Sequence, residues 1–111
     1  MGNGLIGTNL YKDEKPDTYR LNIRRSDITE QRSGYDLYKK ARLPIGYFTL
    51  TTAGNVSGEK MDLSIYDAET TGTLTTDKGD IQFATYVHAL DNYIVFETSS
   101  TGGEKDFKWD F

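Results

Sequence analysis

The sequence predicts an all-β fold, an antiparallel β-sandwich or a small up-and-down barrel of about eight strands. The first indication is a period-two alternation of apolar and polar residues from Gly46 onward, with Gly, Asn and Asp between the runs. Successive side chains of a strand point to opposite faces, so this alternation is typical of strands with one buried face. In the last run, one face carries Phe107, Trp109 and Phe111, whereas the other carries charged residues.

The second indication is the shortness of the connections between the runs. Antiparallel neighbours can be joined by a few residues, whereas parallel neighbours need a crossover of a dozen or more. The third is composition, because Thr occurs fourteen times and Tyr eight times, and both suit a pleated, half-buried surface. A chain of 111 residues has the length of one domain, so we expect a single β domain over residues 1–111.

The N-terminal part predicts two strands after a flexible start at residues 1–4. Leu5 to Tyr11 predicts a short first strand. Thr18 to Arg25 predicts a second, because its apolar side chains share one face: Tyr19, Leu21 and Ile23.

Residues 26–43 are ambiguous between helix and strand. Asp27 and Glu30 have the spacing of a helix capping box, but Gly34 disfavours one continuous helix. We therefore expect a turn or at most one short helix near residues 27–32, followed by a strand over 35–42 that ends at Pro44.

The remaining strands follow from alternation and from the turn residues between them. They are expected at residues 46–52, 60–66, 72–76, 81–90, 93–98 and 106–111. Two of them, 81–90 and 93–98, are nearly apolar on both faces, as Ile94, Val95 and Phe96 show. Such a strand is either central in its sheet or covered by a neighbouring subunit.

Charge is unevenly distributed along the chain. Residues 1–55 carry nine Lys or Arg against six Asp or Glu, whereas residues 56–111 carry four against eleven. The acidic second half disfavours nucleic-acid binding, which needs clustered basic residues. Acidic loops of this kind keep a β-protein soluble. The alternative is an acidic face that binds a basic partner, for which we single out Glu104 and Asp106. No stretch has the length and apolarity of a membrane span.

The sequence contains no recognisable catalytic or cofactor motif. Cysteine is absent, which excludes disulfides, thiol catalysis and cysteine-ligated zinc. His88 is the only histidine, and we expect it to be hydrogen-bonded at a sheet surface. Asp77 and Asp80 bracket a turn without the pattern of a calcium loop. We expect no enzyme activity, no metal and no cofactor.

Aromatic residues are the feature most suggestive of binding. The many tyrosines need a partner for each hydroxyl when buried, so some are expected at a surface, where Tyr favours interfaces. We single out Tyr86, Tyr93 and Trp109. These considerations predict a non-enzymatic structural or protein-interaction domain, such as a virion component or an inhibitor or immunity-type protein, with a protein partner or self-association. The alternative is a barrel that binds a small ligand or a carbohydrate in a pocket lined by these rings.

Overall fold

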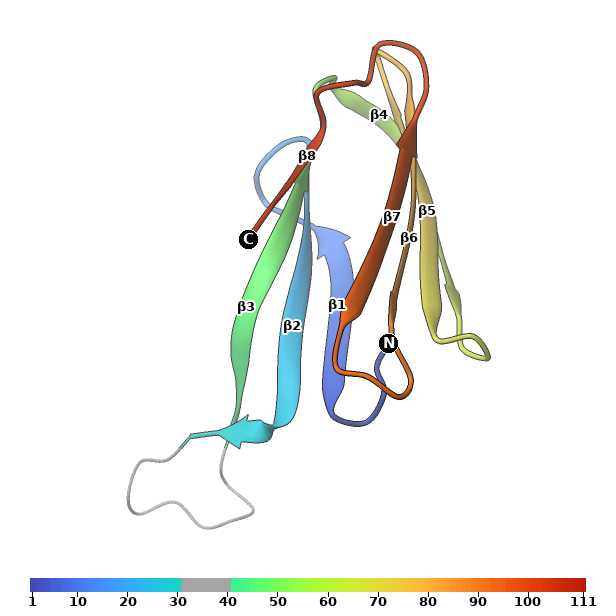
Figure 1. The fold of residues 1–111 in the computed structure, drawn as a ribbon. Coiled ribbons are helices and arrows are strands. Elements are labelled where there is room, and N and C mark those ends of the chain that lie inside the picture. Colours follow the sequence, from blue (N-terminus) through green and yellow to red (C-terminus); the bar gives the residue numbers. More distant parts are fainter. Residues whose placement is uncertain (31–40) are drawn as a thin grey trace.

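The computed structural model describes residues 1–30 and 41–111, which form two four-stranded antiparallel sheets (Figure 1). The first sheet has the order β1-β2-β3-β8 and the second the order β4-β5-β6-β7. The predicted all-β fold is confirmed, and two separate sheets make it a sandwich rather than a barrel. The described ranges contain no helix.

The strands follow one another in meanders, with one return to the first sheet at the end of the chain. Their bounds are β1 Ile6–Lys12, β2 Thr18–Thr29, β3 Arg42–Thr51, β4 Val56–Ser64, β5 Glu69–Thr76, β6 Asp80–Val87, β7 Ile94–Ser100 and β8 Lys108–Asp110. The described residues contain eight strands, in line with the prediction of about eight. The last one is shorter than expected, because only Lys108–Asp110 of residues 106–111 pair with β3.

The prediction for residues 26–43 is wrong at both ends of this stretch. Residues 27–29, where we expected a turn or short helix, continue β2, and Thr29 pairs with Arg42. Pro44 lies inside β3 instead of ending a strand. The β2–β3 register shifts at Arg24, the partner of Pro44, and such an irregularity accommodates a residue without an N–H group. Most of the strand predicted over 35–42 lies outside the described residues.

The core lies between the two sheets and follows the predicted alternation. Its main cluster contains Tyr19 and Leu50 from the first sheet and Leu74, Ile81 and Phe83 from the second. A second cluster toward the other end of the sandwich contains Ile6, Ile23 and Val87. Phe83 pairs with Gly72 across β5 and β6, and its ring occupies the space that a side chain at Gly72 would need.

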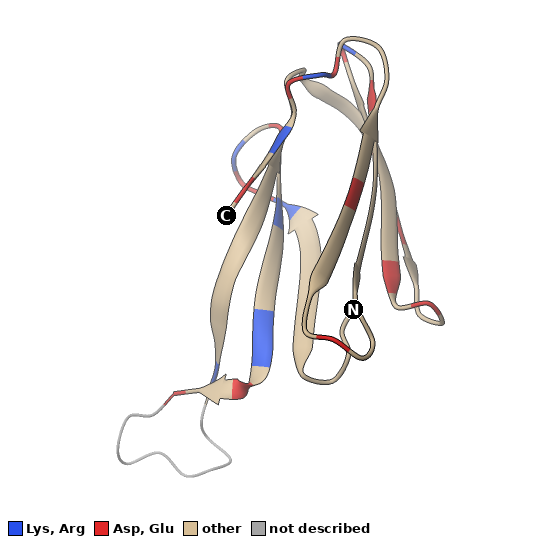
Figure 2. Cartoon of the chain, viewed as in Figure 1, with Lys and Arg blue, Asp and Glu red and all other residues tan. Residues whose placement is uncertain are grey.

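The two doubly apolar strands have different places in the second sheet. β6 is central, paired with β5 on one side and β7 on the other. β7 is an edge strand, paired only with β6 among the described residues. Figure 2 shows that β3 and β7 carry few charges along this side of the molecule, with Glu97 the charged residue of β7.

Residues 1–4, for which we expected a flexible start, make specific contacts. Gly2 forms a bridge with Gly7, which places this segment beside the outer edge of β1. The Asn3 side chain accepts hydrogen bonds from the N–H groups of Leu5 and Ile6 and donates one to the His88 carbonyl, at 3.0 Å. The segment is therefore connected to the turn between β6 and β7.

Candidate functional site

Glu104, in the loop between β7 and β8, is completely buried. Its side chain has no solvent-exposed surface, which is rare for a carboxylate unless every oxygen has partners. Oε1 accepts hydrogen bonds from the Gly54 N–H at 2.6 Å and the Thr76 hydroxyl at 2.7 Å. Oε2 accepts one from the Ala53 N–H at 3.1 Å. One carboxylate thus joins the β3–β4, β5–β6 and β7–β8 connections.

Neighbouring groups extend this arrangement, which we call the Glu104 network: Ala53, Gly54, Thr76 and Glu104. A side chain at Gly54 would clash with Asp77 Oδ1 and would lie 2.7 Å from both Glu104 Oε1 and Thr76 Oγ1, so any larger residue there would displace these side chains. Beside the network, Asp77 accepts hydrogen bonds from the backbone and side-chain N–H groups of Asn55. These bonds hold the pKa of Asp77 below its ordinary value.

The structure places the two acidic candidates very differently. Glu104 cannot contact a partner as we expected, because its oxygens bind the turns of its own chain inside the protein. Asp106, two residues later, is exposed. The sequence contains no local signal for the burial of Glu104, since its partners lie 28 to 51 residues away along the chain.

A group of four rings joins the two sheets on the side of the sandwich where β7 is the edge. We call Phe48, Phe96, Trp109 and Phe111 the aromatic cluster. The ring centroids lie 4.7 Å apart for Phe96 and Trp109, 5.1 Å for Phe48 and Phe96, and 4.9 Å for Phe48 and Phe111. These separations are those of favourable aromatic pairs. In addition, the indole N–H of Trp109 donates to the Thr98 hydroxyl at 3.1 Å.

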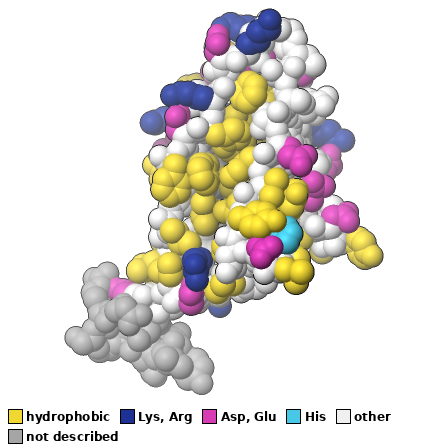
Figure 3. All heavy atoms as spheres, viewed as in Figure 1, with side chains coloured by type: hydrophobic (Ala, Val, Ile, Leu, Met, Phe, Trp, Pro, Cys, Tyr) yellow, Lys and Arg dark blue, Asp and Glu magenta, His cyan; other side chains and the backbone are white. Residues whose placement is uncertain are grey.

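The aromatic cluster belongs to the inner faces of the sandwich, yet solvent reaches it. Trp109 pairs with Leu50, a fully buried residue, so Trp109 and Phe111, two residues on, lie on the inner face of β8 and of the chain beyond it. The Phe111 side chain is nevertheless 79% exposed. Figure 3 shows hydrophobic side chains gathered on this side of the molecule, over β3, β8 and β7. At the aromatic cluster, the core between the two sheets is therefore exposed to solvent.

The three aromatic candidates lie in separate places. Trp109 is part of the aromatic cluster. Tyr93 precedes β7 and stacks on His88, with ring centroids 4.6 Å apart and planes inclined by 20°. Tyr86 pairs with Glu69 and Val95 and lies on the outer face of the second sheet, because its neighbours Thr85 and Val87 are buried. The structure therefore does not bring these rings together in one pocket.

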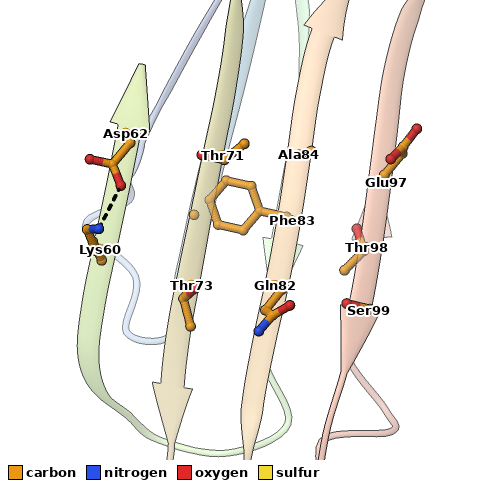
Figure 4. Close-up of a pocket in the computed structure, with 11 residues that line it drawn as sticks. Lys60, Asp62, Thr71, Thr73, Gln82, Phe83, Ala84, Glu97, Thr98 and Ser99 are labelled. Atoms are coloured by element: carbon orange, nitrogen blue, oxygen red, sulfur yellow. Dashed lines mark ion pairs between the residues drawn. The ribbon is translucent and has the colours of Figure 1, made fainter. Parts of the chain in front are cut away.

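A polar hollow of about 570 Å³ lies on the second sheet (Figure 4). Two adjacent cross-strand rows form it. One row contains Asp62, Thr71, Ala84 and Glu97, and the other contains Lys60, Thr73, Gln82 and Ser99. The small side chain of Ala84 leaves space between its longer neighbours. Lys60 and Asp62 form an ion pair of 3.1 Å at one end of the hollow.

The titratable groups with shifted pKa values serve contacts within the fold. Tyr19 donates to Glu59 at 2.6 Å and so connects β2 to β4. Burial raises the pKa of Tyr19, and the bond to Glu59 raises it further. The same hydrogen bond lowers the pKa of Glu59. In the part of the chain that the structure describes, no three His, Cys, Asp or Glu side chains are arranged to hold a metal ion.

Of the aromatic cluster, only Trp109 was predicted from the sequence as a binding residue. Phe111 was expected on the same face of the last strand as Trp109, and Phe96 in a strand that is apolar on both faces, but neither was predicted to bind, and Phe48 was not singled out. What relates Phe48 to Trp109 is the pairing of β3 with β8, because Phe48 is two residues before Leu50, the partner of Trp109. That information belongs to the sheet order, which one sequence does not contain.

Comparison of the chain with protein-family models, curated proteins and solved structures finds no match. Among the described residues, no helix has the length and apolarity needed to cross a membrane.

Proposed function

We propose that this chain is a non-enzymatic protein-interaction domain that binds its partner through the aromatic cluster and the adjoining edge of β7. The observation that carries the proposal is the exposure of Phe111 on the inner face of the sandwich. Inner-face rings are normally covered, and an apolar surface that remains accessible is typical of a contact site. Aromatic residues also supply much of the energy of protein interfaces.

The energetics favour a partner with apolar side chains. Complete burial of one Phe side chain stabilises by about 1.5–3 kcal/mol. Phe111 alone could therefore contribute about tenfold in affinity. The cluster contains no charged residue, so its affinity for a partner does not depend on an acidic or a basic surface.

Selection from a displayed random-peptide library tests this proposal. We expect the immobilised domain to enrich peptides with alternating apolar residues, because such peptides can extend along β7 and cover the rings. A Phe111→Ser variant should bind the selected peptides about tenfold more weakly or worse. The matched control is Tyr66→Ser, because Tyr66 is 98% exposed but lies in the β4–β5 turn.

Two results would contradict the proposal. One is the absence of any enriched peptide. The other is equal binding of the peptides by the native domain and by Phe111→Ser. If only Tyr66→Ser lost peptide binding, the binding surface would be the β4–β5 turn.

The polar hollow supports a second candidate function, the binding of a neutral saccharide. Its two rows present hydroxyl, amide and carboxylate groups from all four strands, and such groups form the hydrogen bonds that sugar hydroxyls need. Calorimetric titration with a panel of neutral oligosaccharides tests it. Binding that is lost in Gln82→Ala but kept in Thr75→Ala, on the same face outside the hollow, is the expected result. No heat of binding with any member of the panel would contradict it.

A further inference from the structure

The four edge strands of the described sheets differ in how well they are protected against pairing. β1 is bordered by the Gly2–Gly7 bridge, and the Thr8 N–H donates to the Met1 carbonyl. β4 carries Glu59, Lys60 and Asp62 and has an irregularity at its start. β8 has three residues, of which Lys108 and Asp110 form an ion pair. Charges, short length and bulges are the usual protections of sheet edges.

β7 has none of these protections apart from Glu97. It is seven residues long, contains no Pro, Lys or Arg, and pairs with β6 without a register shift. Its first three residues, Ile94, Val95 and Phe96, are apolar on both faces. A long regular apolar edge is a template for another strand.

The hydrogen-bonding groups of this edge can be assigned from the bonds at both ends of β7. The Tyr93 carbonyl accepts from the His88 N–H at 3.1 Å, and the Thr101 N–H donates to the Asp80 carbonyl at 2.9 Å. Residues 93 and 101 therefore direct their groups toward β6. Because this direction alternates along an antiparallel strand, Ile94, Phe96 and Thr98 direct their N–H and C=O groups away from β6.

We propose that the edge is occupied by β7 of a second copy of this chain, antiparallel across a two-fold axis, so that the two second sheets form one continuous sheet of eight strands. This inference rests on the proposed function and identifies its partner. A strand related by a two-fold axis presents the same alternation of N–H and C=O groups, so the edge is complementary to itself. Two-fold pairing is also the commonest symmetry of protein oligomers.

Charge excludes one register of this pairing, and among the registers that remain we propose the one whose axis lies at Phe96. Only residues on the same face can be opposite one another, so the axis passes through a residue position. An axis at Glu97 would place two carboxylates directly opposite, which is destabilising. An axis at Phe96 separates them: Phe96 faces its own copy, and Val95 faces Glu97 of the other chain. The two Phe96 rings then extend the aromatic cluster across the interface.

The absence of cysteine makes a direct test of this register possible. Residues 95 and 97 direct their backbone groups toward β6, so in the dimer they form a pair without mutual hydrogen bonds. The Cα atoms of such a pair are about 4.5 Å apart, within the range of a disulfide. An equimolar mixture of Val95→Cys and Glu97→Cys chains should therefore form a covalent dimer on mild oxidation, whereas neither variant should do so alone. Asp62→Cys, on the other edge of the same sheet, is the matched control.

The mass in solution is measured first, by light scattering over a range of concentrations. We expect twice the 12.5 kDa of one chain, and a Val95→Lys variant with a dissociation constant raised about tenfold or more. A dimer that cross-links through Asp62→Cys, or through either β7 variant alone, would overturn the pairing proposed. A monomer at every concentration would overturn the second copy as partner. Peptide binding that still depends on Phe111 would then leave the proposed function standing.

Discussion

Glu104 of the Glu104 network and Phe111 of the aromatic cluster are only a few residues apart in the sequence, yet they differ in exposure: one is completely buried and the other is largely exposed. At Glu104 a charged group is fully withdrawn from water and its oxygens accept three hydrogen bonds. At Phe111, seven residues later, an apolar ring on the inner face of the sandwich remains largely in water. The comparison shows that the acidic residue serves the fold, whereas most of the apolar ring is exposed to solvent, and there we propose that a partner binds.

The physical reason for the difference lies in what each group can bind within the chain. The turns around Glu104 supply N–H and hydroxyl donors that would otherwise be buried without an acceptor. The aromatic cluster has apolar neighbours on its inner side only, because the first sheet ends there with the three residues of β8. A bound partner, as we propose, would cover the exposed side of the cluster.

The largest expected effect is that of Glu104→Ala. Removal of the carboxylate leaves the N–H groups of Ala53 and Gly54 without their acceptor, whereas the Thr76 hydroxyl keeps the Gly79 carbonyl at 3.0 Å, so we expect a loss of about 3–5 kcal/mol in the free energy of unfolding. Urea unfolding followed by circular dichroism measures it. Asp106→Ala is the matched control, since this exposed carboxylate should change stability by less than about 0.5 kcal/mol. Equal effects of the two substitutions would refute the structural role of Glu104.

The next effect separates two members of the aromatic cluster. Phe48 contacts two other rings and packs against the cluster of Ile6, Ile23 and Val87, so Phe48→Ala should destabilise by about 2–3 kcal/mol. Phe111→Ala should cost less than about 1 kcal/mol, because most of the ring is already in water. The same urea experiment compares them. If Phe111→Ala destabilised more than Phe48→Ala, Phe111 would belong to the core, and the aromatic cluster would not be an exposed part of it.

A substitution at Gly54 tests how tightly the Glu104 network is packed. A methyl group there would clash with Asp77 Oδ1 and would meet Glu104 Oε1 and Thr76 Oγ1 at 2.7 Å, so Gly54→Ala should destabilise by about 2 kcal/mol. Gly7→Ala serves as the control, because its nearest atom beyond its chain neighbours is 3.8 Å away. Thermal unfolding of the two variants should give a clearly lower midpoint for Gly54→Ala; matching midpoints would speak against close packing.

The smallest expected effect is on the stability of the domain at acid pH. The pKa of Asp77 is lowered by its hydrogen bonds from Asn55, so its contribution to stability is complete above the ordinary value of 3.8 and is lost as the pH falls through the lower value of the folded state. Asp77→Asn should therefore make the decline of stability in acid less steep. The side chains of the aromatic cluster do not titrate, so peptide binding through these rings should be independent of pH wherever the domain is folded. A pH-dependent affinity in the range where the domain is folded would contradict binding through these rings alone.

Local patterns predicted the strands well because alternation is a local property. The Tyr19, Leu21 and Ile23 face of β2 and the Trp109 face of β8 are both where the period places them. The prediction that a strand ends at Pro44 was wrong, because the register shift between β2 and β3 accommodates a proline within β3. β6 and β7 were both predicted to be nearly apolar on both faces, but they have different positions in the sheet, and Glu104 is buried by donors far away in the sequence. Such features depend on the order of the strands and on their packing.

Amide hydrogen exchange along β7 tests the central claim most directly. The N–H groups of Ile94, Phe96 and Thr98 point away from β6, so they should exchange rapidly in dilute protein despite their place in a strand. They should become protected when a selected peptide binds or when the protein concentration is raised, whereas the outer edge of β4 should not change. If these three amides remain unprotected while a partner binds, or if protection appears on β4 instead, the β7 side is not the binding surface.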